Sequence, residues 1–131
     1  MIHTLSEALT DGVRVRVVSQ YLPERSRPEV DHYFFVYTVR IGNEGEVPVQ
    51  LMSRHWIIRD GDGREQHVQG PGVVGAQPNL KPGEAFEYTS FCPLPTPTGS
   101  MRGTYQMVRP DGEGFDAVVA PFLLSRDEAW N

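Results

Sequence analysis

The stretch Val13-Arg14-Val15-Arg16-Val17 decides the fold, because apolar and charged side chains alternate along it without interruption. A period of two residues is typical of a β-strand with one buried face, and it places the valines in a core and the arginines in water. The next such run, Tyr33 to Ile41, is apolar on both parities for much of its length. It predicts a central strand that is covered on both faces. Together the two runs indicate an all-β protein.

A third long segment, Val47 to Arg59, changes phase halfway along. Val49 and Leu51 share one parity, whereas Trp56 and Ile58 share the other. One extra residue moves every later side chain to the opposite face, so we predict a β-bulge near Ser53-Arg54. The segment Arg64 to Gln69 then returns as the second strand of a hairpin.

Three further segments have strand character, and short turn signals rich in Gly, Asp and Pro separate them. They are Phe86–Ser90, Met101–Met107 and Phe115–Leu124. The total of about seven strands predicts an antiparallel β-sandwich with no helix longer than a turn or two. Two irregular stretches, 70–83 and 92–99, are the expected places for a binding site, because functional residues concentrate in loops.

Composition limits the function classes. The 131 residues fit one domain, 1–131, and the net charge of −5 excludes a broad polycationic surface for nucleic acid. The longest apolar run, 117–124, contains Pro121 and is too short to span a membrane, so we expect neither a nucleic-acid nor a membrane partner. A single cysteine and an N-terminus without a signal-peptide pattern predict a cytoplasmic protein.

The string Gly70-Pro71-Gly72-Val73-Val74-Gly75 fits the pattern G-x-G-x-x-G of dinucleotide-binding folds. That motif needs a helix directly after it, and the prolines at 78 and 82 prevent one. We therefore expect a tight loop in which the glycines serve backbone geometry. The alternative is a nest of amides that binds an anion through Gly70, Gly72 and Gly75, with Lys81 or Arg64 nearby.

Two of the four histidines could face each other across a hairpin. His55 and His67 lie on its two strands, and Asp60 lies at the turn, so the three are weak candidates for a divalent cation site. Aspartate at a hairpin more often stabilises the turn itself. No cofactor or metal is expected on this evidence.

The sequence contains no catalytic pattern, so we expect a protein that is not an enzyme. Cys92 lies between Phe91 and Pro93 without a basic neighbour, which favours a buried thiol over a nucleophile. Arg54 and Trp56 are candidates for a partner-binding patch, since Arg and Trp are frequent binding anchors. A core position is the favoured interpretation of Trp56, which Ile57 and Ile58 follow directly.

Several motifs together resemble the bacterial ApaG family over nearly the whole chain. They are Leu51-Met52-Ser53-Arg54-His55-Trp56-Ile57-Ile58, the glycine string with Gln77-Pro78, Pro82-Gly83-Glu84, Phe86 to Ser90, and Gly99 to Tyr105. The resemblance implies a small sandwich of the fibronectin type III or immunoglobulin-like kind. It also implies links to cobalt resistance, to magnesium efflux, and to a gene neighbourhood shared with diadenosine tetraphosphate hydrolase. Related domains in an F-box protein and a polymerase-interacting protein look like interaction modules, and no catalytic residues come with the family.

These observations favour a non-enzymatic module that binds a protein partner and is only indirectly associated with divalent cation homeostasis. A homo-oligomer formed through an exposed edge strand fits an open sandwich as well. The alternative function is that of a small-ligand binder, for a nucleotide or polyphosphate at the glycine loop or for a divalent cation near His55.

Overall fold

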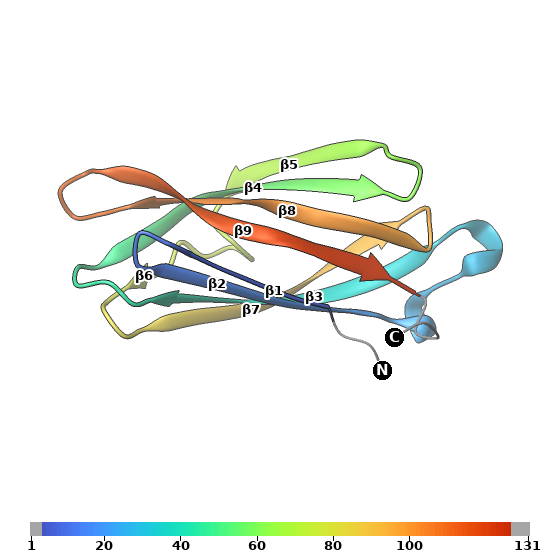
Figure 1. Cartoon of the computed structure of the whole chain (residues 1–131), viewed down its shortest axis with the longest axis horizontal. Coiled ribbons are helices and arrows are strands. Elements are labelled where there is room, and N and C mark those ends of the chain that lie inside the picture. Colours follow the sequence, from blue (N-terminus) through green and yellow to red (C-terminus); the bar gives the residue numbers. More distant parts are fainter. Residues whose placement is uncertain (1–3, 127–131) are drawn as a thin grey trace.

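The computed structural model describes residues 4–126, which form nine strands and two short 3-10 helices. Figure 1 shows two layers of antiparallel strands stacked as a sandwich. The strands are β1 (Thr4–Thr10), β2 (Val13–Tyr21), β3 (Tyr33–Asn43), β4 (Val49–Asp60), β5 (Glu65–Pro71), β6 (Asn79–Leu80), β7 (Ala85–Leu94), β8 (Thr98–Val108) and β9 (Gly114–Ser125). The helices η1 (Pro23–Arg25) and η2 (Pro28–Val30) have three residues each, which confirms the prediction of very little helix.

The strands divide into two sheets. Sheet I has the order β1-β2-β3-β7, and sheet II has the order β5-β4-β8-β9 with the short β6 added beside β4. All pairings are antiparallel. On one side of the sandwich β9 packs against β1 and β2, where the Ser19 hydroxyl donates to the Leu123 carbonyl and the Val118 amide donates to the Thr10 hydroxyl. The predicted antiparallel β-sandwich is confirmed.

The core lies between the sheets, and β2 contributes its valine side chains to it, as predicted. Val13, Val15 and Val17 are fully buried, while Arg14 and Arg16 point to the opposite face of sheet I. From sheet II, the Trp56 ring enters the same core and makes edge contacts with the rings of neighbouring buried aromatic residues. These are Tyr37, Tyr105 and Phe122, at centroid distances of 5.5, 6.0 and 5.9 Å.

The prediction for the central strand β3 was wrong on one face. Its odd-numbered residues from Tyr33 to Asn43 are buried, whereas the other face is only half-covered. On that outer face Phe34 meets the Phe91 ring at 5.4 Å, and the guanidinium of Arg25 lies 4.6 Å from the Phe34 ring centre. The His32 ring also lies 5.9 Å from the Phe34 ring, yet the apolar side chains on this face of the run stay partly in water.

The phase change in β4 is caused by a bulge, as predicted. The register against β8 shifts between Leu51 and Ser53, so Met52 is the extra residue, close to the expected position. Val49 and Leu51 are buried before the bulge and Trp56 after it, because the extra residue restores the inward face. The hairpin from β4 to β5 is confirmed as well.

Three local features differ from the sequence-based expectation. Strands β1 and β6 were not predicted, and β7 continues through Cys92 to Leu94 instead of ending before the Pro-rich stretch. Cys92 and Leu94 both face the core, and Pro93 is accommodated because β7 is an edge strand that pairs only with β3. Within residues 4–126 no helix has the length and apolar character needed to cross a membrane.

Candidate binding surfaces

The glycine string forms the end of β5 and a tight turn. Gly72 and Gly75 have φ angles of +60° and +81°, and Val74 between them has +43°. The amides of Val73 and Ala76 donate to each other's carbonyl oxygens at 2.8 Å, and the Gly72 amide donates to the Met52 carbonyl at 2.9 Å. These three loop amides are therefore engaged inside the protein instead of pointing at a common anion.

Arg54, not Lys81, lies against this loop. Its Nη1 atom donates to the carbonyl oxygens of Pro71 and Gly72, both at 2.9 Å. The side chain passes over Gly70, where a Cβ would lie 3.1–3.3 Å from the guanidinium. Lys81 follows β6, which pairs with the beginning of β4, whereas Gly70 pairs with Arg54 beyond the bulge. Of the four residues of the predicted anion loop, Gly70 and Gly72 lie against Arg54, a cation of the protein itself, whereas Gly75 and Lys81 make no such contact with it.

Trp56 does not form a surface patch with Arg54. Only 3% of Trp56 is exposed, so its ring belongs to the core, which is the alternative that the flanking isoleucines favoured. The same core contains a buried pair of hydroxyl groups, those of Tyr88 and Tyr105, which hydrogen-bond to each other. Burial raises the pKa of both tyrosines, and the positive charge of Arg54 opposes that shift. Both phenols thus stay neutral at physiological pH.

Cys92 is buried on β7, where it pairs with Phe35 of β3. Burial raises the pKa of its thiol to about 12, so the reactive thiolate is essentially absent near neutral pH. Cys92 is buried, as expected for a small hydrophobic residue. Its role in the structure is to fill space between the sheets.

The two candidate histidines meet on the outer face of sheet II. The Nε2 atom of His55 lies 2.9 Å from Nδ1 of His67, and the Gln69 amide lies 3.4 Å from His55 Nε2. Asp60 is not part of this group, because its carboxylate accepts the amides of Asp62 and Arg64 and so closes the hairpin turn. The part of the chain from 4 to 126 contains no cluster of three or more His, Cys, Asp or Glu side chains arranged for a metal.

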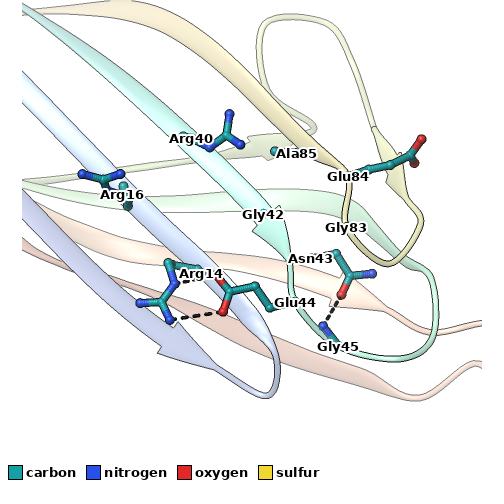
Figure 2. A pocket seen from close by; sticks show the side chains of 10 residues that line it. All are labelled: Arg14, Arg16, Arg40, Gly42, Asn43, Glu44, Gly45, Gly83, Glu84 and Ala85. Carbon is teal, nitrogen blue, oxygen red and sulfur yellow. Dashed lines mark hydrogen bonds and ion pairs between the residues drawn. The ribbon is translucent and has the colours of Figure 1, made fainter.

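A site that sequence reasoning missed lies on the outer face of sheet I. An open depression lies where the start of β2 and the end of β3 meet the start of β7 (Figure 2). Its volume is about 340 Å³. Three arginines, glycine backbone and two glutamates line it. The lining residues are Arg14, Arg16, Arg40, Gly42, Asn43, Glu44, Gly45, Gly83, Glu84 and Ala85, and we call this depression the arginine pocket.

The three arginines of this pocket have unequal partners. Arg14 forms ion pairs with Glu44 at 2.6 Å and Glu7 at 2.7 Å, and Arg16 pairs with Glu7 at 2.9 Å. The Arg14 hydrogen bond lowers the pKa of the Glu44 carboxyl. Arg40 lies directly opposite Arg16 in the β2–β3 register, and among residues 4–126 no carboxylate comes within ion-pair distance of it. Its charge is therefore available to an added group.

Beside the arginine pocket, the same face carries exposed apolar side chains. Leu5 and Val18 are register partners on β1 and β2, and Val36 and Phe91 are partners on β3 and β7. Leu5 is 58% exposed, Val18 37% and Phe91 49%. Together with Phe34 these residues are called the apolar patch. The sequence signal for it is the apolar second parity of β3, which predicts a buried face and in the structure is partly exposed.

Comparison with known proteins agrees with this architecture. The ApaG domain family matches residues 23–109. Protein ApaG of Anaeromyxobacter dehalogenans is 61% identical over 120 residues, which cover 92% of this chain and 94% of that protein. Protein ApaG of Bordetella pertussis is 58% identical over 111 residues, 85% of each chain.

The fold has a solved counterpart. The crystal structure of a Bordetella pertussis protein described as ApaA superposes with a TM-score of 0.87 at 55% identity, covering 89% of this chain and 95% of that one. The sequence identity extends over nearly the full length of both chains, and the two proteins share the same sandwich. The chain therefore belongs to the ApaG domain family.

Proposed function

We propose that this protein is a non-enzymatic binding module that binds a protein partner through the outer face of sheet I. The observation that carries the proposal is the apolar patch lying on the same face as the arginine pocket. Exposed aromatic and arginine side chains are the anchors that contribute most to protein–protein interfaces. Phe91 and Arg40 both have exposed side chains on this face and belong to adjacent strands.

The chemistry of this face defines the partner. A segment that fits it presents apolar side chains over Phe91 and Val18 and a carboxylate or phosphate toward Arg40. Arg40 has Arg16 in register on one side and Glu87 on the other, and neither Glu87 nor another described carboxylate is within ion-pair distance of it, so an added anionic group can pair with it. Arginine also holds such a group in a directional, two-pronged geometry.

A small anionic ligand is the second candidate, and the same pocket favours it. A nucleotide or polyphosphate would bind between Arg16 and Arg40 instead of at the glycine loop, whose carbonyls face Arg54. The link to cobalt and magnesium homeostasis that the resemblance implies would run through the partner. We propose in addition that the protein is cytoplasmic and that its sandwich is related to the fibronectin type III fold.

A capture experiment with matched surface variants tests the protein-binding function. The tagged chain, Phe91→Ser, Arg40→Glu and the control Val118→Ser are each incubated with extract of the native cytoplasm, and captured proteins are quantified by mass spectrometry. Val118 is a suitable control because it is 43% exposed on β9 of the other sheet. The proposal expects a protein that the parent and Val118→Ser enrich and that both sheet I variants lose.

Two outcomes contradict the proposal. Equal enrichment by all four chains would place the binding surface elsewhere. Loss in Val118→Ser alone would move it to sheet II. Light scattering of the purified chain belongs to the same experiment, because a dimer disrupted by Phe91→Ser would make a second copy the partner. A titration with ATP checks the small-ligand alternative, which expects saturable binding that Arg40→Glu removes.

A further inference from the structure

The two histidines on the outer face of sheet II are held close together by strand register. His55 on β4 pairs with Gln69 on β5, and the neighbouring pair is Ile57 with His67, so the two imidazoles lie diagonally across the hairpin. Diagonal neighbours on one face of a sheet are within reach of long side chains. The result is a distance of 2.9 Å between Nε2 of His55 and Nδ1 of His67.

This distance matches the spacing of two adjacent ligands of one metal ion. A bond from imidazole nitrogen to a first-row metal is about 2.0–2.1 Å long, so two nitrogens 2.9 Å apart subtend an angle of about 90° at a shared ion. Neighbouring positions in square-planar, tetragonal and octahedral coordination are also separated by about 90°. Tetrahedral coordination would need a nitrogen–nitrogen distance of about 3.4 Å at the same bond length.

The surroundings suit a cation that keeps water ligands. His67 is exposed and His55 is half-buried, so an ion can enter from solvent and complete its coordination with water. Two arginines line hollows next to His55: Arg102 is 3.6 Å from the carboxylate of Glu65 and is partly neutralised by it, and the Arg54 guanidinium is directed to the carbonyls of Pro71 and Gly72. A rotation of the Gln69 amide would turn its oxygen toward the same point, because its nitrogen now lies 3.4 Å from His55 Nε2.

We propose that His55 and His67 bind one divalent metal ion of tetragonal or octahedral preference, Ni²⁺ or Cu²⁺, with the two nitrogens in adjacent positions. In the metal-free protein one ring donates its N–H to the other. In the bound state that proton lies on the second nitrogen of its own ring, so both facing nitrogens offer lone pairs. The site does not depend on the function proposed for sheet I, which lies in the other layer of the sandwich.

Calorimetric titration with NiCl2 at neutral pH tests the proposal. All chains carry His3→Gln, because His3 lies outside the described residues and would add an imidazole of its own. In this background we expect one equivalent of Ni²⁺ to bind, and His55→Gln or His67→Gln to weaken the affinity about ten-fold or more, since each variant loses one of two nitrogen ligands. His32→Gln is the matched control, and MgCl2, an ion that prefers oxygen ligands, should give no saturable heat.

Spectroscopy of the Cu²⁺-loaded chain supplies a readout that is independent of affinity. Electron paramagnetic resonance should show coupling to two imidazole nitrogens in the His3→Gln chain and to one in either single variant. The melting temperatures of the metal-free variants check that each one is folded. The proposal is overturned if Ni²⁺ shows no saturable binding at millimolar concentration, or if binding is the same in both single variants and in the His32→Gln control.

Discussion

Replacing Gly72 by alanine should destabilise the protein far more than the same replacement at Gly75. Both glycines have left-handed φ angles, +60° and +81°. A Cβ at Gly72 would overlap the carbonyl oxygen of Ala76, whereas a Cβ at Gly75 would have no atom within 4 Å. The two variants therefore share the cost of the backbone conformation and differ only in the steric overlap.

The magnitudes follow from that difference. A side chain in the left-handed region costs about 1–2 kcal/mol, part of which is offset because alanine also restricts the unfolded chain, by about 0.4–1 kcal/mol. Gly75→Ala should thus lower the free energy of unfolding by about 1 kcal/mol. The overlap at Gly72 adds about 1–3 kcal/mol, since overpacking forces the backbone to move. Gly72→Ala should lose about 3 kcal/mol.

Urea denaturation of the parent and both variants measures these losses, with the slope of the transition expected to stay constant. Equal losses in the two variants would refute the steric argument, because the Ala76 carbonyl and the Gln77 side chain crowd a Cβ only at Gly72. The competing account, in which the loop binds phosphate, expects a Gly72→Ala chain of ordinary stability that has lost nucleotide affinity. Titration of the parent with ATP decides that point directly.

Three further predictions concern buried tyrosines, the buried cysteine and the half-buried Arg54. The folded state raises the pKa values of Tyr88 and Tyr105, so the unfolded chain loses these protons first as the pH rises. The free energy of unfolding should therefore fall above about pH 10, by up to about 1.4 kcal/mol per pH unit for each tyrosine. Urea denaturation across that pH range should show a shallower fall in a Tyr88→Phe/Tyr105→Phe chain. The Cys92 thiol, with its pKa raised to about 12, should react with Ellman's reagent only as fast as the protein unfolds, and immediate labelling of the native protein would show that it is accessible. Arg54→Met should cost about 1.5–3 kcal/mol in urea denaturation, because the carbonyls of Pro71 and Gly72 lose a charged donor; an unchanged transition would mean that water replaces it.

The parts of the fold that the sequence predicted are those in which a local pattern agrees with the packing. Strict alternation placed Val13, Val15 and Val17 in the core, and the change of parity within β4 located the bulge to within a residue or two. Strand β1 was missed for the opposite reason. It turns its leucines, Leu5 and Leu9, to solvent, so its pattern gives no sign of a buried face.

The candidate sites were harder to predict because they depend on register between distant strands. His55 and His67 belong to one hairpin, and their proximity could be anticipated from twelve residues of separation. Arg16 and Arg40 become neighbours only through the pairing of β2 with β3, which no local motif reveals. The glycine string matched a nucleotide-binding pattern by its letters, whereas its backbone forms a turn that holds Arg54.

Photo-cross-linking in the living cell tests the proposed binding surface most directly. Benzoylphenylalanine replaces Phe91 on the outer face of sheet I in one chain and Val118, of similar exposure on sheet II, in another. We expect irradiation to produce a discrete cross-linked species from position 91 that is absent from position 118, and that Arg40→Glu in the same chain diminishes. A cross-link formed from position 118 and not from position 91 would contradict the assignment of sheet I as the binding face.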